Sequence, residues 1–203
     1  KRPENIKPIA MVIMTDKIRK NAAKTLEFFK NQGVNIKIIS GDNPITVARI
    51  AKQVGVDNAD KYVDATTLNN EDDIIRAAGE YNIFGRTTPY QKRQLMHALQ
   101  NAGHTVGMIG DGVNDILALR DSDCSIAMAQ GSDAARQVSQ FVLLNSDFSA
   151  VPDILREGRR VVNNIERAAS MFLIKNIYSF VLSLLLLFFS TSYPFQPIQL
   201  TLL

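Results

Sequence analysis

Three acidic residues each follow an apolar run and are separated from it by one residue. These three acids are the first candidates for metal binding or catalysis. IAMVIM precedes Asp16, NIKIIS precedes Asp42, and HTVGMI precedes Asp111. Carboxylates gathered at one edge of a fold repel one another unless a cation shares the site. Mg²⁺ takes oxygen ligands and often bridges a protein to a phosphate. The three acids therefore predict a Mg²⁺ site that receives a phosphoryl group.

The segment MIGDGVNDILAL, residues 108–119, holds most of the candidate chemistry. Asp111 lies between Gly110 and Gly112, and glycines allow a backbone to approach a phosphate closely. Asp115 falls on the same side as Asp111 if the turn is helical, so we expect it to bind the metal through water or to orient Asp111. The Asn114 amide is suited to donate a hydrogen bond to a phosphate oxygen.

Further polar residues complete a phosphate site. Ser40 offers a hydroxyl at the end of a predicted strand, and the Gly41 amide can point at an anion. Lys92, just inside a predicted helix, is a compact cation suited to a phosphoryl group, and Arg86 is expected to add supporting charge. Phosphoryl transfer depends mainly on charge stabilisation and positioning, which these residues supply.

A covalent phosphoenzyme also needs a nucleophile, usually an aspartate in this arrangement. Asp16 is the early strand-end acid, but the Lys-Ile-Arg-Lys that follows it is not a glycine- or threonine-rich phosphate loop. We therefore do not assign Asp16 as the nucleophile and expect that group to lie upstream.

The elements that must position these residues alternate between apolar runs and helical patterns. Strands are predicted at 9–14, 35–40, 62–65, 82–87, 104–109, 124–129 and 141–144, with helices at 22–33, 44–55, 70–81, 89–103 and 131–139. Such alternation predicts an α/β fold with a Rossmann-like, doubly wound parallel sheet, whose ligand crevice lies beyond the carboxyl ends of the strands. A single aspartate at a strand end can equally be a helix cap or a turn former.

The C-terminal part has a different composition. From Ala168 to Pro194 the only charged residue is Lys175. As a helix, residues 168–192 reach about 37 Å, which exceeds a hydrocarbon core of about 30 Å. The preceding flank contains four arginines and the following flank has no charge, so the positive-inside rule predicts that residues 1–167 are cytoplasmic. The alternative is a long buried core helix.

Composition excludes other classes. The net charge is +3 and no Lys/Arg-rich block carries interleaved aromatics, which argues against nucleic-acid binding. The single Cys124 rules out an internal disulfide.

Taken together, these segments resemble the cation-transporting P-type ATPases, in the C-terminal half of their haloacid dehalogenase-like phosphorylation domain and the membrane helix that follows. TDKIR resembles the family's Asp-Pro-Pro-Arg element without its prolines, and SGDNPITVARIAKQVGV resembles its Thr-Gly-Asp element with serine in place of threonine. FGRTTPYQK resembles the lysine-containing segment, and IGDGVNDILAL resembles Thr-Gly-Asp-Gly-Val-Asn-Asp-Ala-Pro-Ala-Leu. SIAMAQGSDAARQVSQFVLL and EGRRVVNNI continue the pattern into the stalk.

The resemblance implies a role for each matched residue. Asp111 would be a direct Mg²⁺ ligand supported by Asp115, and Lys92 would contact the acyl phosphate. Ser40, Gly41 and Asn114 would help to hold the phosphoryl group, and Asp42 and Arg19 would lie near the nucleotide and its hinge. Asp16, Arg86 and Gly112 complete the set of expected phosphate- or nucleotide-binding residues. ATP is the implied substrate.

The family's phosphorylated aspartate lies in an Asp-Lys-Thr-Gly-Thr motif, which is absent here, as are its nucleotide-binding insert and actuator loop. The resemblance thus implies a fragment of a pump. Its expected parts are residues 1–152 of the phosphorylation domain, a stalk at 153–167, a transmembrane helix at 168–192, and a loop with the start of the next helix at 193–203. Its expected partners are ATP, a transported cation, the lipid bilayer and the remainder of the pump.

In the family the fifth membrane helix supplies ion ligands, which makes Lys175, Asn176 and Ser179 candidates for an ion pathway. A lysine inside a bilayer needs a partner or a water-filled pocket, so Lys175 is either functional or snorkels to the interface. Ser179 replaces a glutamate of calcium and sodium pumps.

Two alternatives remain open at this point. A soluble haloacid dehalogenase-like phosphatase would use the same acids and lysine, and a non-catalytic Mg²⁺- or phosphate-binding module would need no nucleophile.

Overall fold

The computed structural model describes residues 10–11, 18–19, 21–145 and 147–189. It divides into two units, Lys1–Val151 and Pro152–Leu203. The helices are α1 Ala22–Asn31, α2 Pro44–Gln53, α3 Glu71–Glu80, α4 Pro89–Asn101, α5 Ile116–Asp121, α6 Asp133–Val138 and α7 Val151–Phe189, with short 3₁₀ turns at Ala65–Thr67, Val113–Asp115 and Phe148–Ala150. The strands are β1 Ile38–Ile39, β2 Tyr62–Asp64, β3 Ile83–Gly85, β4 Gly107–Gly110, β5 Cys124–Met128 and β6 Phe141–Leu143.

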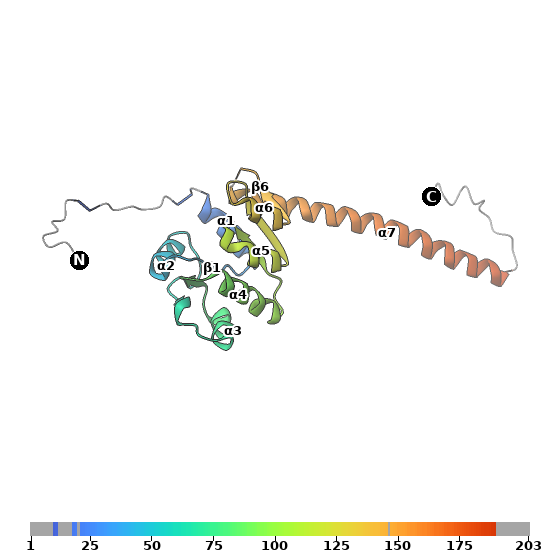
Figure 1. Ribbon diagram of the computed structural model, residues 1–203. Helices are drawn as coiled ribbons and strands as arrows, with labels where there is room; N and C mark the ends of the chain where they lie inside the picture. The colour runs from blue at the N-terminus through green and yellow to red at the C-terminus, as the bar shows by residue number, and fades with distance from the viewer. Residues whose placement is uncertain (1–9, 12–17, 20, 146, 190–203) are drawn as a thin grey trace. The chain divides into compact units, whose positions relative to one another are not determined.

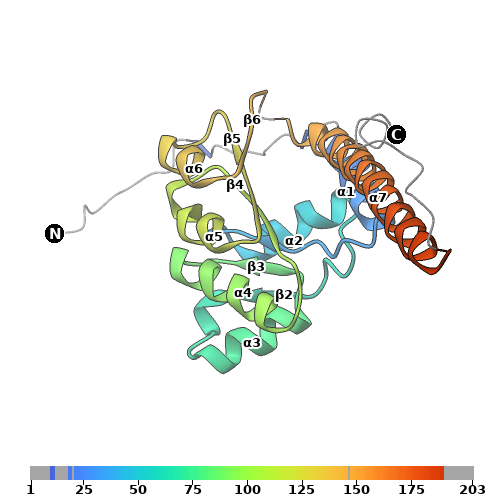
Figure 2. The same ribbon diagram turned by 90° about the vertical axis from the view of Figure 1, so that its right-hand side faces the viewer.

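All described strand pairs in the first unit are parallel, as the strand–helix alternation predicts. The strands form two three-stranded sheets with the orders β1-β3-β2 and β4-β5-β6 (Figures 1 and 2). The fold class is confirmed, but the expectation of one sheet is not met among the described residues. Alternation determines that crossover connections join parallel strands, whereas it does not determine which strands share hydrogen bonds. The strand predicted at 9–14 lies largely outside the described residues.

Helices cover both faces of the first sheet. Ile83 and Phe84, adjacent on the central strand β3, are both fully buried and point to opposite faces. Ile83 packs with the apolar side of α2, whereas Phe84 packs with residues of α3 and with Leu95 of α4.

Helix α4 packs against both sheets. Leu95 lies in the core beside Phe84 of the first sheet, and the next residue, Met96, lies in the core formed by β4, β5, α5 and α6. Because α4 contributes to both cores, its packing fixes the position of its residues relative to both sheets.

The second unit consists mainly of α7, which begins at Val151 and runs without a break to Phe189. At 1.5 Å per residue this helix is about 58 Å long. It is long and apolar enough to cross a membrane, with a mean hydropathy of 2.0 over its most apolar window, none of which is buried within the protein. The predicted stalk and span up to residue 189 are thus parts of one helix, and residues 190–192 lie outside the described part.

Candidate functional site

The turn after β1 is closed by the side chain of Ser40. Its hydroxyl donates to Asp42 Oδ2 at 3.0 Å and accepts from the Asp42 amide at 3.1 Å. Helix α2 begins two residues after Asp42, at Pro44. Asn43 caps this helix by accepting a hydrogen bond from the Ile45 amide, and Pro44 lies in its first turn. Hydrogen bonds therefore close this turn on both sides of Gly41, which is exposed.

The loop after β3 is hydrogen-bonded onto this turn. The Thr87 amide and hydroxyl both donate to the Ser40 carbonyl, at 3.0 and 2.8 Å, and the Arg86 amide donates to the Asp42 carbonyl at 2.8 Å. Arg86 has a positive φ of 52°, an uncommon conformation for a residue with a side chain. These bonds hold it there and bring the start of α4 next to the Ser40 turn.

The Arg86 side chain itself turns to the neighbouring strand, where Nη1 donates to Asp64 Oδ2 at 2.8 Å. Hydrogen bonds from Thr66 hold the pKa of Asp64 below its ordinary value, and the positive charge of Arg86 lowers this pKa further. The guanidinium thus already has a carboxylate partner at the end of β2, and its predicted supporting role toward phosphate is untested.

Helix α4 begins with a complete capping box immediately before Lys92. Thr88 Oγ1 accepts from the Gln91 amide at 3.2 Å, and Gln91 Oε1 accepts from the Thr88 amide at 3.0 Å. Gln91 Nε2 also donates to the Ala65 carbonyl at 2.7 Å, which ties the first turn to the segment after β2. The position of Lys92 is therefore set by the cap as well as by the core.

Lys92 and Asp115 form a buried ion pair. Lys92 Nζ lies 2.7 Å from Asp115 Oδ1, and the two side chains are only 9% and 11% exposed. The second carboxylate oxygen, Oδ2, accepts from the Gly112 amide at 3.2 Å. A Cβ on Gly110 would lie 2.8 Å from the Cβ of Asp115, so glycine is required at this point of β4. Sequence reasoning placed Lys92 and Asp115 at one site, and the structure brings them into contact.

Asp111 is exposed at the end of β4, and its backbone is packed against the loop after β5. The Ser132 amide donates to the Asp111 carbonyl at 2.8 Å, and a Cβ on Gly131 would lie 2.5 Å from that carbonyl oxygen. Asn114 lies exposed on the following 3₁₀ turn. The backbone of Asp111 is thus held firmly while its carboxylate faces solvent.

The donor set suits Mg²⁺ because Asp111 and Asp115 supply carboxylate oxygens. Mg²⁺ keeps several waters and is commonly bound through one or two carboxylates plus a phosphate. Within the described ranges no three His, Cys, Asp or Glu side chains converge as a metal site. The predicted convergence of three strand-end acids stays a prediction, because Asp16 lies outside the described residues. Among those residues, Asp42 bonds to Ser40.

Arg19 lies just before α1. Its carbonyl accepts a hydrogen bond from the Ala22 amide at 3.1 Å and so supports the start of this helix. Hydrogen bonds from Ser149 lower the pKa of Asp147, and the charge of Arg19 contributes to the same shift. The predicted role of Arg19 near a nucleotide stays a prediction.

Helix α7 carries the ion-pathway candidates in its apolar part. Asn176 is exposed, while Lys175 and Ser179 are partly covered. The Ser179 carbonyl accepts from the Ser183 hydroxyl at 2.8 Å, a bond within the helix. The ion-pathway role of these residues stays a prediction.

Residues that sequence reasoning did not select also shape the site. Thr87 holds the Ser40 turn, and Gly131 with Ser132 supports Asp111. The sequence contained one indication of these residues, because small residues follow strands β3 and β5 at the same edge as the selected acids. A further acid, Asp121, binds three side chains of the helix that carries Lys92, and nothing in its local sequence indicates this.

The chain is similar to a known protein family. The model of the haloacid dehalogenase-like hydrolase family matches residues 2–123. The chain belongs to the haloacid dehalogenase-like hydrolase family. The α/β fold, the strand-end acids and the lysine of α4 are thus parts of a haloacid dehalogenase-like domain.

Its curated relatives are cation-transporting ATPases by name, which confirms the resemblance seen in the sequence. The chain is 48% identical to the probable cation-transporting ATPase exp7 of Streptococcus pneumoniae, over 100% of this chain and 27% of that protein. It is 43% identical to the calcium-transporting ATPase CtpE of Mycobacterium tuberculosis, over 98% of this chain and 26% of that protein. The chain therefore spans about a quarter of the length of these relatives.

Two solved structures resemble this haloacid dehalogenase-like chain. The catalytic domain of the CPx-ATPase CopB-B has a TM-score of 0.54 at 28% identity, over 69% of this chain and 46% of that chain. A zinc-transporting PIB-type ATPase in the E2.Pi state has a TM-score of 0.67 at 24% identity, over 84% of this chain and 24% of that chain, and this likeness concerns the fold alone.

Proposed function

We propose that the chain is part of an ATP-driven cation-transporting P-type ATPase, in which it holds Mg²⁺ and the phosphoryl group of an aspartyl phosphate. In this proposal residues 1–152 belong to the phosphorylation domain, 153–167 form a stalk, 168–192 cross the membrane, and 193–203 lead into the next span. The buried contact between Lys92 and Asp115, beside the exposed Asp111, carries the proposal. The similarity to cation-transporting ATPases over the whole chain supports it.

Each site residue has a physical task in this proposal. The Lys92 ammonium stabilises the charge of the phosphoryl group, and the Ser40 hydroxyl, the Gly41 and Gly112 amides and the Asn114 side chain orient its oxygens. Asp111 would bind Mg²⁺ directly. Asp115 would support the metal shell, and through its ion pair it positions Lys92. Bound Mg²⁺ supplies neutralisation of phosphate charge.

The acceptor aspartate is proposed to come from another segment of the pump, because the Asp-Lys-Thr-Gly-Thr motif does not occur within residues 1–203. Asp16, Arg19, Asp42 and Arg86 are proposed to lie near ATP in the assembled protein.

We further propose that α7 crosses the membrane with residues 1–167 in the cytoplasm and that Lys175, Asn176 and Ser179 face the ion pathway. The arginine-rich segment before the apolar part of α7 supports this orientation. The cargo is proposed only as a cation, because relatives are named for different ones, calcium in CtpE and magnesium in the magnesium-transporting P-type 1 ATPase of Salmonella typhimurium.

A binding experiment tests the site. The full chain in lipid nanodiscs is titrated with Mg²⁺ and inorganic phosphate while backbone amide signals are followed by NMR. We expect saturable shifts at residues 40–42 and 110–114 that require both ligands. Asp111→Asn should remove the Mg²⁺ dependence, whereas Asp60→Asn, which removes an exposed ion pair with Lys52, should leave it intact. Equal shifts in both variants would contradict the proposed site.

The haloacid dehalogenase-like family match also supports a phosphatase as a second candidate. Steady release of phosphate from an aryl phosphate by the isolated chain would favour this candidate over the pump. The long apolar helix α7 favours the pump.

A further inference from the structure

Helix α5 connects the acidic turn to the rest of the fold and depends on its neighbours for stability. It has six residues, Ile116–Asp121, and helices shorter than about 12 residues are marginal in water on their own. Ala118 and Leu119 are fully buried with Met96 of α4. Because α5 directly follows Asp115, its placement along α4 decides where the acidic turn lies.

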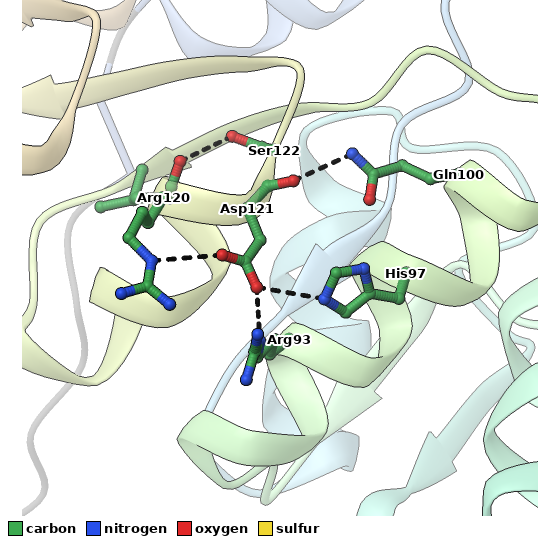
Figure 3. A network of polar contacts seen from close by, with 7 residues as sticks. Arg93, His97, Gln100, Arg120, Asp121 and Ser122 are labelled. Atoms are coloured by element: carbon green, nitrogen blue, oxygen red, sulfur yellow. Dashed lines mark hydrogen bonds and ion pairs between the residues drawn. The ribbon is translucent and has the colours of Figure 1, made fainter.

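The last residue of α5, Asp121, is bound by three side chains of α4 (Figure 3). The Arg93 guanidinium donates to Oδ2, and His97 Nε2 lies 3.1 Å from the same oxygen. Gln100 Nε2 donates to the Asp121 carbonyl at 2.9 Å, which occupies an acceptor at the helix end. Arg120, on α5 itself, donates to Oδ1 at 3.3 Å.

The carboxylate of Asp121 is largely covered, whereas its partners Arg93 and His97 are partly exposed. The Asp121 side chain is only 13% exposed. Burial alone would raise its pKa, but the hydrogen bonds from Arg93, Arg120 and His97 outweigh burial and hold the pKa below its ordinary value. The charged carboxylate is therefore the form that this part of the fold stabilises.

Polar contacts tie the two helices at both ends of α5. Asp115, just before α5, binds Lys92, and Asp121, at its end, binds the residue next to that lysine, Arg93. Between them the contact is apolar, and apolar contacts are non-directional and tolerate sliding more easily than hydrogen bonds. The Asp121 contacts therefore set the register of α5 on α4.

We propose that Asp121 is a positioning residue: by fixing α5 on α4 through Arg93, His97 and Gln100, it keeps Lys92 in contact with Asp115 at the phosphoryl site. The contact geometry stands by itself, and its value for phosphoryl binding rests on the proposed function. Asp121 touches neither phosphate nor metal in this proposal.

Amine reactivity measures the effect directly. The full chain in nanodiscs is labelled with limiting acetic anhydride, and each lysine's rate is read by peptide mass spectrometry. Asp121→Asn should raise the rate at Lys92 about tenfold relative to exposed Lys30 and Lys52, as expected when a charge-assisted hydrogen bond that opposes local opening is lost. Asp121→Glu, which keeps the charge, should recover part of the protection.

Two controls separate positioning from general destabilisation. Lys37, half-buried and donating to the Tyr81 carbonyl at 2.7 Å, lies away from this contact and reports global opening. Asp60→Asn removes one negative charge elsewhere and should change no rate. A rise at Lys92 and Lys37 together, or an unchanged rate at Lys92, overturns the proposal.

A separate arm keeps the two proposals distinguishable. In the wild-type chain, Mg²⁺ with inorganic phosphate should slow labelling of Lys92. Failure of this arm alone contradicts the proposed phosphoryl site and leaves the positioning result standing.

Discussion

Replacing Lys92 by methionine removes the cation from a buried ion pair while keeping an unbranched side chain of similar length. Asp115 then keeps the Gly112 amide at Oδ2 but loses its partner at Oδ1. Removing one member of a buried pair costs about 3–5 kcal/mol, because a charge stays buried without compensation. The side chains are 9% and 11% exposed rather than fully buried, so we expect the lower end, about 3 kcal/mol.

The matched control is an ion pair of nearly equal length on the surface. Lys30 Nζ lies 2.6 Å from Asp57 Oδ1, but these side chains are 56% and 57% exposed. Exposed pairs contribute about 0–1 kcal/mol, so Lys30→Met should change stability by less than about 1 kcal/mol. Contact distance is thus held constant between the two variants, and burial is what differs.

Urea denaturation of the first unit, followed by NMR amide intensities in nanodiscs, measures both variants. With a slope of about 1–3 kcal/mol per M, a loss of about 3 kcal/mol in Lys92→Met should lower the midpoint by about 1–3 M without changing the slope. The double variant Lys92→Met/Asp115→Leu removes both charges and should recover much of that loss. Equal midpoints for Lys92→Met and Lys30→Met would refute the argument from burial.

Four further outcomes follow from the structure. Gly110→Ala should lower stability by about 1–3 kcal/mol, seen as a lower urea midpoint, and weaken Mg²⁺-dependent phosphate binding, because its methyl group overlaps Asp115. Gly131→Ala should displace the Asp111 backbone and weaken Mg²⁺ binding in the same titration, since the new Cβ would lie 2.5 Å from the Asp111 carbonyl oxygen. The pKa of Asp121 in the folded protein lies below its ordinary value of 3.8, so the charged carboxylate stabilises the fold fully above that pH and loses this effect as the pH falls through the folded-state pKa. The difference in unfolding free energy between wild type and Asp121→Asn should therefore shrink on acidification below 3.8. A difference that stays constant would contradict this. Helix α7 should carry the chain into the lipid fraction on flotation with liposomes, and recovery in the aqueous fraction would argue against a span.

The sequence alone determined the class of the fold and most of its elements, whereas the short helix α5, Ile116–Asp121, was not among the predicted helices. Each predicted helix is present within a few residues, because apolar periodicity, prolines in the first turn and caps such as Thr88 act locally. The predicted strands from 35–40 onward are also present, although several are shorter than expected. Composition alone indicated the long apolar helix at the C-terminal end.

Only the tertiary structure decided which polar groups meet. The sequence placed Lys92, Asp111 and Asp115 at one edge, but it did not show that Asp115 is bound by both Lys92 and the Gly112 amide, leaving Asp111 exposed. Nor did it show that Asp121 contacts Arg93, His97 and Gln100 of the helix that carries Lys92. The contacts of Lys92 with Asp115 and of Arg93 with Asp121 join residues more than twenty positions apart, and they depend on how α4 and α5 pack, which local pattern cannot encode.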